Sequence, residues 1–239
     1  RVILGHSLRE QGITEVYGRE RSRWFVKAPA FSFAKIRGME SYLSPEMKST
    51  GEVLGIGKTI EEAMFKGLVS AGFKMCHPSE QRPVGVYMTV NDQDKFDIVS
   101  IAKKFADLGC TIYATKGTAE VISELGVDVT VVDRLSATDT VVKLMNEGKI
   151  DYIVYTGKTD LESINDFIRL HHHAILLGIT VLTALDTANA LADIIASKFT
   201  EDNTELVDIN HLRKEKLQLS FTKMQSCGND YIYFDNRDG

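Results

Sequence analysis

Residues 84–199 alternate between short apolar runs and longer segments with a helical period. Short apolar runs bounded by turn residues are typical of buried strands, and we expect strands at 84–90, 110–114, 127–132, 152–155 and 179–183. The intervening segments predict helices at 94–108, 118–125, 138–146, 161–177 and 187–199. Apolar strands separated by helices predict an α/β fold with three layers, in which a five-stranded parallel sheet carries helices on both faces.

The first predicted helix of this region has an apolar face. That face is expected to consist of Phe96, Val99, Ile101, Phe105 and Leu108, of which Ile101 fits the helical spacing least well. We therefore expect these side chains to pack against the sheet.

The chain before the alternating region is organised differently. Residues 1–77 contain a strand-like run at 23–29 and a predicted helix at 59–71, for which Thr59 is the expected N-cap. Two prolines within six residues then predict a linker at 78–83.

The chain after the alternating region is polar at first. Residues 200–216 are rich in charged side chains and predict a second linker. Residues 217–239 predict the β-rich beginning of another unit, and they resemble neither of the two preceding segments.

Composition narrows the class of protein. The chain has 239 residues, of which 44% are hydrophobic and 26% charged, with a net charge of −5, and it contains no block of Lys and Arg that would predict nucleic-acid binding. Its most apolar stretch, at 174–185, is shorter than the roughly 20 residues of a membrane span. Cys76, Cys110 and Cys227 are scattered, which predicts neither a zinc site nor a disulfide framework and favours a cytoplasmic protein.

Residues 114–119, which read Ala-Thr-Lys-Gly-Thr-Ala, are the clearest candidate site. They follow the second predicted strand and open a helix. Gly117 permits close backbone approach, the helix start offers N–H groups, and Thr115 and Thr118 add hydroxyls, so the run predicts a phosphate-binding turn. A helix cap without a ligand is the alternative.

Two cations are expected near the same edge of the sheet. Lys95 follows the first strand and Arg134 follows the third strand. Because the carboxyl ends of parallel strands meet at one edge, both charges are expected to converge on a bound anion. The alternative is that each is a solvated surface cation.

Three other motifs are weaker candidates for a functional site. Residues 55–59, Gly-Ile-Gly-Lys-Thr, lack the first glycine of a P-loop, because Glu52 stands there, and a turn before a capped helix is the expected structure. The histidines at 171–173 point about 100° apart on a helix and are expected to lie on its surface. Capping and solvation are the expected roles of the carboxylates near the strand ends, Asp133, Asp139, Asp160 and Asp166.

Residues 1–76 resemble the end of the second ATP-grasp half of carbamoyl-phosphate synthase large subunits. The resemblance is carried by residues 44–55, Ser-Pro-Glu-Met-Lys-Ser-Thr-Gly-Glu-Val-Leu-Gly, and supported by residues 31–38. It implies a parent ligase that uses ATP with Mg or Mn, whose binding residues lie upstream, so no cofactor is expected within this chain. The implied protein partners are the rest of the large subunit and the glutamine amidotransferase small subunit.

Residues 84–199 resemble the methylglyoxal-synthase-like (MGS-like), Rossmann-like domain that follows in those subunits. The signature is the Ala-Thr-x-Gly-Thr-Ala run at 114–119. The resemblance implies a regulatory nucleotide, UMP or IMP. The residues implied to hold its phosphate are Lys95, Thr115, Gly117, Thr118 and Arg134, the last in place of the usual Lys.

The same resemblance implies three further contacts. Thr89 stands where a small hydroxyl residue is usual, and Thr156 is expected near the sugar or base. Thr183 is expected near the contact with the synthetase half, where ornithine acts as a further ligand. The chain departs from the family at 135–138, where a Gly-Arg-Pro-rich loop is usual, and at 155–157, where Tyr-Thr-Gly replaces Asn-Thr-Thr.

The end of the chain resembles the start of diaminopimelate epimerase. The match is Phe-Thr-Lys-Met-Gln-Ser-Cys-Gly-Asn-Asp-Tyr at 221–231, in which Asn229 corresponds to a substrate contact. Cys227 is not one of the two catalytic cysteines of that family, so no epimerase activity is expected from this truncated segment.

Three functions follow as hypotheses. The first is a non-catalytic regulatory fragment that binds a nucleotide and controls carbamoyl phosphate synthesis for pyrimidine and arginine biosynthesis. The second is a methylglyoxal-synthase-type lyase, for which Asp139 is the available carboxylate although the Gly-Gly-Asp loop is missing. The third is a docking domain that has lost its effector site. Neither nucleic acid nor membrane is expected as a partner.

Overall fold

The computed structural model describes residues 1–14, 23–32, 46–79, 81–157, 161–209, 221–226 and 229–234. The chain forms two compact units, Arg1–Thr204 and Glu205–Gly239. Several predicted features fall at least partly outside the described residues: Asp160, Cys227, and parts of the runs at 31–38, 44–55, 78–83 and 200–216.

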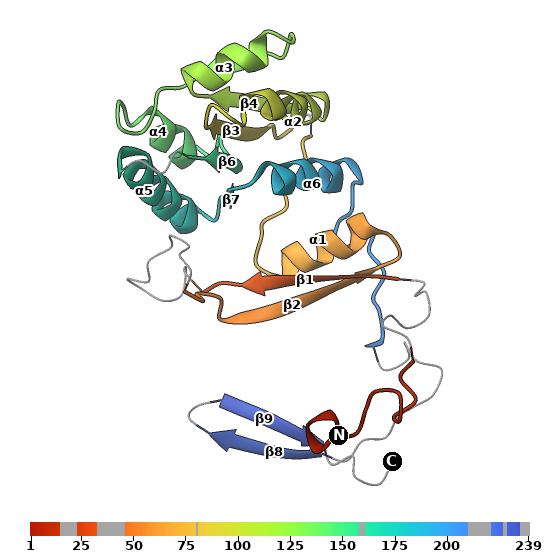
Figure 1. Ribbon diagram of the computed structural model, residues 1–239. Helices are drawn as coiled ribbons and strands as arrows, with labels where there is room; N and C mark the ends of the chain where they lie inside the picture. The colour runs from red at the N-terminus through yellow and green to blue at the C-terminus, as the bar shows by residue number, and fades with distance from the viewer. Residues whose placement is uncertain are drawn as a thin grey trace. The chain divides into compact units, whose positions relative to one another are not determined.

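The first unit contains a five-stranded parallel sheet (Figure 1). Its strands are β3 (Val84–Val90), β4 (Cys110–Ala114), β5 (Val129–Val131), β6 (Tyr152–Thr156) and β7 (Thr180–Leu182). They lie in the order β5-β4-β3-β6-β7, and every neighbouring pair is parallel. The predicted α/β fold with a five-stranded parallel sheet is confirmed.

Helices cover both faces of this sheet. They are α2 (Lys95–Asp107), α3 (Lys116–Ser123), α4 (Thr140–Asn146), α5 (Leu161–Leu177) and α6 (Leu185–Ala196). Helices α2, α3 and α6 contribute to one hydrophobic core, and α4 and α5 to the other. Each core packs on its own face of the sheet, which is the three-layer arrangement expected of doubly wound folds.

Strand β3 divides the two cores because its side chains alternate between them. Val86 and Met88 belong to the core of α2, α3 and α6, whereas Tyr87 belongs to the core of α4 and α5. Strand β6 alternates in the same way, with Tyr152 on the first side and Ile153 on the second. Burial on both faces explains why these strands read as unbroken apolar runs in the sequence.

The strand order places a topological switch between β3 and β6. From β3 the chain proceeds through β4 to β5 on one side, and then returns to add β6 and β7 on the other side. In such sheets, ligands bind beyond the carboxyl ends of the strands at the point where the order reverses. A ligand-binding site is therefore expected at this edge of the sheet.

Several details of the predicted helices are wrong: α4 begins at Thr140 and not at 138, and α6 spans Leu185–Ala196 and not 187–199. Phe96 is 88% exposed, and α2 instead buries Ile98, Val99, Ile101, Ala102 and Phe105. The reason is rotational, because Phe96 precedes Ile98 by two residues and so points about 200° away from it. Helix α3 begins at Lys116 and not at Thr118, so Gly117 and Thr118 lie within its first turn.

The same unit contains a smaller layer before the sheet. It consists of the antiparallel strands β1 (Trp24–Ala30) and β2 (Gly51–Gly57) and helix α1 (Ile60–Ser70). A short 3-10 helix, Val2–Leu4, precedes this layer in the sequence. Residues 55–57 end strand β2 and do not form the turn that the sequence predicts. Helix α1 lies against both strands.

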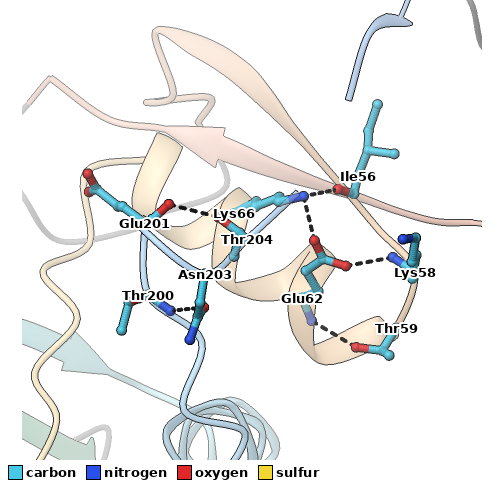
Figure 2. Close-up of polar contacts among 9 residues, drawn as sticks. All are labelled: Ile56, Lys58, Thr59, Glu62, Lys66, Thr200, Glu201, Asn203 and Thr204. Atoms are coloured by element: carbon cyan, nitrogen blue, oxygen red, sulfur yellow. Dashed lines mark hydrogen bonds and ion pairs between the residues drawn. The ribbon is translucent and has the colours of Figure 1, made fainter. Parts of the chain in front are cut away.

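Thr59 caps helix α1, as predicted. Its hydroxyl accepts a hydrogen bond from the Glu62 amide at 3.2 Å. Figure 2 shows that the Glu62 carboxylate, in a residue only 4% exposed, accepts from the Lys58 amide at 2.8 Å and from Lys66 Nζ at 2.7 Å. Lys66 Nζ also donates to the Ile56 carbonyl at 2.9 Å. This buried carboxylate has charged and neutral donors that offset its desolvation.

Gly55 and Gly57 allow helix α1 to approach strand β2 closely. A Cβ atom at Gly55 would lie 2.0 Å from the Ala63 carbonyl oxygen, and one at Gly57 would lie 2.6 Å from the Ala63 amide nitrogen. The two glycines therefore serve helix–strand packing. No phosphate-binding loop is formed by residues 55–59, in agreement with the sequence-based interpretation.

Tyr152, the first residue of β6, and Asp151, which precedes it, hold the segment that leads into the parallel sheet. The buried Tyr152 hydroxyl accepts from the Cys76 amide at 2.6 Å and donates to the Cys76 carbonyl at 3.1 Å. Arg82 donates to the Asp151 carboxylate at 2.6 Å, and the same carboxylate accepts from the Gly85 amide at 3.2 Å. These bonds fasten residues 76–85 at the amino ends of β3 and β6, opposite to the switch-point edge.

The second unit contains strands β8 (Phe221–Ser226) and β9 (Asn229–Phe234), which pair in antiparallel fashion. This agrees with the β-rich segment that the sequence predicts. Among the described residues of the whole chain, no helix is both long enough and apolar enough to cross a membrane.

The packing at Gly55 predicts a large loss of stability for Gly55→Ala. The added methyl group would clash with backbone atoms of Ala63 and Gly67, which cannot rotate away. We expect the free energy of unfolding, measured in urea, to fall by about 3 kcal/mol. Gly51→Ala is the matched control, because nothing lies within 4 Å of its added Cβ. Equal stability of the two variants would contradict the packing role.

Candidate functional site

Three threonine hydroxyls meet at the carboxyl edge of β3 and β4. Thr115 Oγ1 lies 3.2 Å from Thr89 Oγ1 and 3.3 Å from Thr118 Oγ1. The Val90 amide donates to Thr118 Oγ1 at 3.3 Å. Thr115 and Thr118 are only 6% and 1% exposed, so packing fixes their positions. The structure thus brings together three of the threonines that the sequence singles out.

The start of helix α3 adds backbone donors to this cluster. Thr115 is the N-cap residue, but its side chain makes no capping bond, because its hydroxyl faces Thr89 and Thr118. The Thr118 amide donates to the Thr115 carbonyl at 2.9 Å. Within the described part of the chain, the amides of Lys116 and Gly117 have no backbone or side-chain acceptor. Donors of this kind at a helix start attract anions.

Lys95 lies over the start of helix α3. Its Nζ atom is 3.2 Å from the position that a Cβ atom of Gly117 would occupy. The absence of a side chain at Gly117 therefore leaves room for the ammonium group next to the free amides. Lys95 Nζ also pairs with the Asp92 carboxylate at 2.8 Å, and both side chains are partly exposed to solvent. An anion at this position would compete with Asp92 for Lys95.

The loop between β3 and α2 is held by Asn91. Its side-chain oxygen accepts from the Gln93 and Asp94 amides at 2.9 Å and 3.0 Å, and its amide group donates to the Asp94 carboxylate at 2.8 Å. The Asn91 backbone amide donates to the Thr156 carbonyl at 2.8 Å, with Thr156 Oγ1 at 3.2 Å. Thr156 therefore fixes the loop that carries Lys95.

Arg134, the second predicted cation, lies near Thr89. Both residues, with Asn91, line a small cavity of about 40 Å³ whose wall also includes Tyr87 and Asp166. Arg134 is exposed to solvent. Burial raises the pKa of the Tyr87 phenol, and the neighbouring Tyr155 and Asp166 add to this effect while Arg134 opposes it. Tyr87 is therefore a neutral hydrogen-bonding group at physiological pH.

A second, larger cavity of about 900 Å³ opens beside the small one. Thr156 and Thr183 line it, so these two predicted contacts lie apart from the hydroxyl cluster. Its described lining includes the carboxylates of Asp94, Asp97 and Asp186 but neither Lys nor Arg. Burial lowers the pKa of His171, which also lines it. The large cavity is therefore unsuited to a phosphate and suited to a neutral or cationic group.

The remaining candidates do not join this site. His173 Nδ1 lies 2.8 Å from the Arg169 carbonyl, and His172 and His173 form an edge-to-face pair. His171 is partly buried, which corrects the expected surface position of all three histidines. Asp139 is exposed and lies 3.7 Å from Arg169. No group of three or more potential metal ligands occurs among the described residues.

Sequence reasoning missed Asn91, Asp92 and the packing of Tyr155. A signal for the first two was present, because a polar Asn-Asp-Gln-Asp run directly follows an apolar strand. The packing of Tyr155 depends on residues from α5 and has no local signal.

The chain matches a known protein family over part of the parallel sheet. Residues 97–183 match the model of the MGS-like domain family. Over this range the chain is similar to MGS-like domains. The matched range includes Thr115, Gly117 and Arg134, whereas Thr89 and Lys95 precede it.

A solved structure of methylglyoxal synthase from Elizabethkingia anophelis NUHP1 is similar to the chain. The sequences are 22% identical, the TM-score is 0.39, and the match covers 56% of this chain and 92% of that chain.

The position of Lys95 predicts a specific effect of Gly117→Ala. The added methyl group would stand 3.2 Å from Lys95 Nζ and displace this flexible side chain. We expect orthophosphate affinity, measured by isothermal titration, to fall about three- to tenfold, while stability stays equal or rises by up to about 1 kcal/mol because Ala favours helix. Gly67→Ala in α1 is the control for helix propensity, since its Cβ makes an ordinary 3.5 Å contact. Unchanged phosphate affinity would contradict the placement of Lys95.

Proposed function

We propose that residues 84–199 are a regulatory module that binds the phosphate of a nucleoside monophosphate, of the UMP or IMP type. The observation that carries this proposal is the position of Lys95 Nζ beside Gly117, where two α3 amides have no acceptor among the described residues. Thr115, Thr118 and Thr89 supply hydroxyls at the same edge. An ammonium, backbone amides and hydroxyls together match the acceptor oxygens of a phosphate.

Arg134 supplies the second cation of the proposed site. It lines the small cavity that Thr89 also lines, and Thr89 is hydrogen-bonded to the hydroxyl cluster through Thr115. A guanidinium group can donate two parallel hydrogen bonds to a phosphate, which a lysine in the same place cannot do. The site would then contact one phosphate from both sides of β3.

We further propose that the parent protein is a carbamoyl-phosphate synthase large subunit. The MGS-like domain supports an allosteric domain of such an enzyme, and the run at 44–55 supports the synthetase half before it. In that setting the parent uses ATP with Mg or Mn, associates with a glutamine amidotransferase small subunit, and has ornithine as a further ligand near Thr183. The chain itself contributes regulation and not catalysis.

The physical basis of such regulation is linkage. A nucleotide that binds one arrangement of the module more tightly shifts the whole enzyme toward that arrangement. Coupling free energies of this kind are typically about 1–3 kcal/mol. The bonds from Tyr152 and Asp151 to Cys76, Arg82 and Gly85 tie the parallel sheet to the segment that precedes it in the chain.

The lyase hypothesis has less support. Its available carboxylate, Asp139, is exposed, pairs with Arg169, and is absent from the described lining of both cavities. The docking-only hypothesis makes a different prediction, namely that no nucleotide or phosphate binds.

Isothermal titration of the chain with UMP, IMP and orthophosphate tests the proposal. We expect saturable binding that weakens at higher ionic strength. Lys95→Ala is expected to reduce affinity about 10- to 100-fold, because a charge-assisted bond is lost, and Thr115→Ala about fivefold. Lys103→Ala, on the same helix but paired with Asp107, is the matched control and should bind as the wild type does.

Two outcomes would contradict the proposal. Wild-type affinity in Lys95→Ala would remove the phosphate assignment. Absence of binding by all three probes would favour the docking-only hypothesis.

A further inference from the structure

The small and large cavities at the switch-point edge share part of their walls. Asn91, Tyr155, Gly157 and Ser163 line both of them. Of these four residues, Tyr155 has by far the largest side chain. Its ring is therefore the main described barrier between a space of about 40 Å³ and one of about 900 Å³.

Contacts with Ser163, Phe167 and Gly157 help to hold the Tyr155 ring in this position. Its hydroxyl donates to the Ser163 carbonyl at 2.7 Å. The Phe167 ring packs against it with centroids 5.0 Å apart and planes tilted by 50°. The ring also covers Gly157 closely, since a Cβ atom there would lie 2.1 Å from Tyr155 Cε1. The ring is thus fastened at its tip and packed on its sides.

The two cavities differ in charge as well as in size. The small cavity is lined by the Arg134 guanidinium and the Thr89 hydroxyl, with Asp166 as its carboxylate. The large cavity carries Asp94, Asp97 and Asp186 and, among its described lining residues, no Lys or Arg. A phosphate is therefore favoured on the small side, and an uncharged organic group on the large side.

A space of about 40 Å³ has room for only a few water molecules and is too small for a nucleoside. A space of about 900 Å³ is typical of cavities that hold a whole organic ligand. A nucleotide with its phosphate beside Thr89 and Arg134 would therefore extend past Tyr155 into the large cavity.

We propose that Tyr155 is a gate that sets how much organic group can accompany a phosphate in this site. This inference rests on the proposed function. Inorganic phosphate binds with the ring in place. A nucleoside monophosphate binds only when the ring leaves Gly157 and gives up its bond to Ser163, so the gate lowers nucleotide affinity and leaves phosphate affinity unchanged.

The test is the ratio of UMP affinity to orthophosphate affinity in the 239-residue chain and its variants, measured by isothermal titration. Tyr155→Ala removes the ring and is expected to raise UMP affinity about tenfold or more, with phosphate affinity unchanged. Tyr155→Phe keeps the ring but loses the bond to Ser163, so UMP affinity is expected to rise about two- to tenfold. This second variant preserves packing if Tyr155→Ala fails to fold.

Tyr113→Ala is the matched control. This partly buried tyrosine lies one strand away, packs near Gly85 at the other end of β3, and lines neither cavity. Its UMP-to-phosphate ratio should equal that of the wild type.

The outcomes separate the gate from the proposed function. A lower UMP affinity in Tyr155→Ala would show that the ring supports the nucleoside, and an unchanged ratio in both Tyr155 variants would show that the ring does not matter. Either result overturns the gate while phosphate binding that depends on Lys95 preserves the proposed function. Failure of phosphate and UMP to bind the wild type and both variants overturns both.

Discussion

The parallel pairing of β3 with β4 on one side and β6 on the other determines where every functional candidate lies. Because both neighbours run in the same direction as β3, their carboxyl ends deliver Thr89, Thr115 and Thr156 to one edge of the sheet. The register is in turn fixed by burial of β3 on both faces, since a shift by one residue would exchange Val86 and Tyr87 between the two cores. The positions of the threonines at the carboxyl edge thus depend on how β3 packs in the centre of the sheet.

Glycine, lysine and threonine stand together both at 55–59 and at 116–118, where they have different structural roles. At 55–59 the glycines admit helix α1 to the strand surface, and the backbone groups that follow bond to Glu62 and Lys66 within the layer (Figure 2). At 116–118 the glycine leaves room for the lysine of another helix, and two amides remain without an acceptor in the described structure. The two segments differ in whether their backbone N–H groups already have acceptors within the protein. The Lys58 amide of the packing motif has one, whereas the Lys116 and Gly117 amides of the candidate anion site have none among the described residues.

Strands buried on both faces, and a helix with a regular apolar period, were predictable from sequence. The bounds of β3, β4 and α5 agree with the predicted ones because apolar runs and helical periods directly record burial. The first turn of α3 was placed wrongly because Thr115, the N-cap residue, turns its hydroxyl toward Thr89 on another strand, which no local pattern reveals. The distribution of Thr156, Thr183 and Tyr155 between two cavities likewise depends on α5 and α6, which are distant in sequence.

The most direct measurement of the central claim is an amide chemical-shift map of the ¹⁵N-labelled chain titrated with UMP. If the phosphate binds at the start of α3, the shifts should be saturable and largest for the Val90, Lys116 and Gly117 amides, which lie at the hydroxyl cluster and the start of α3. The amides of residues 55–59 should not move, because helix α1 and strand β2 already occupy that space. Shifts centred on residues 55–59, or no shifts at the carboxyl edge of β3 and β4, would contradict the proposed phosphate site.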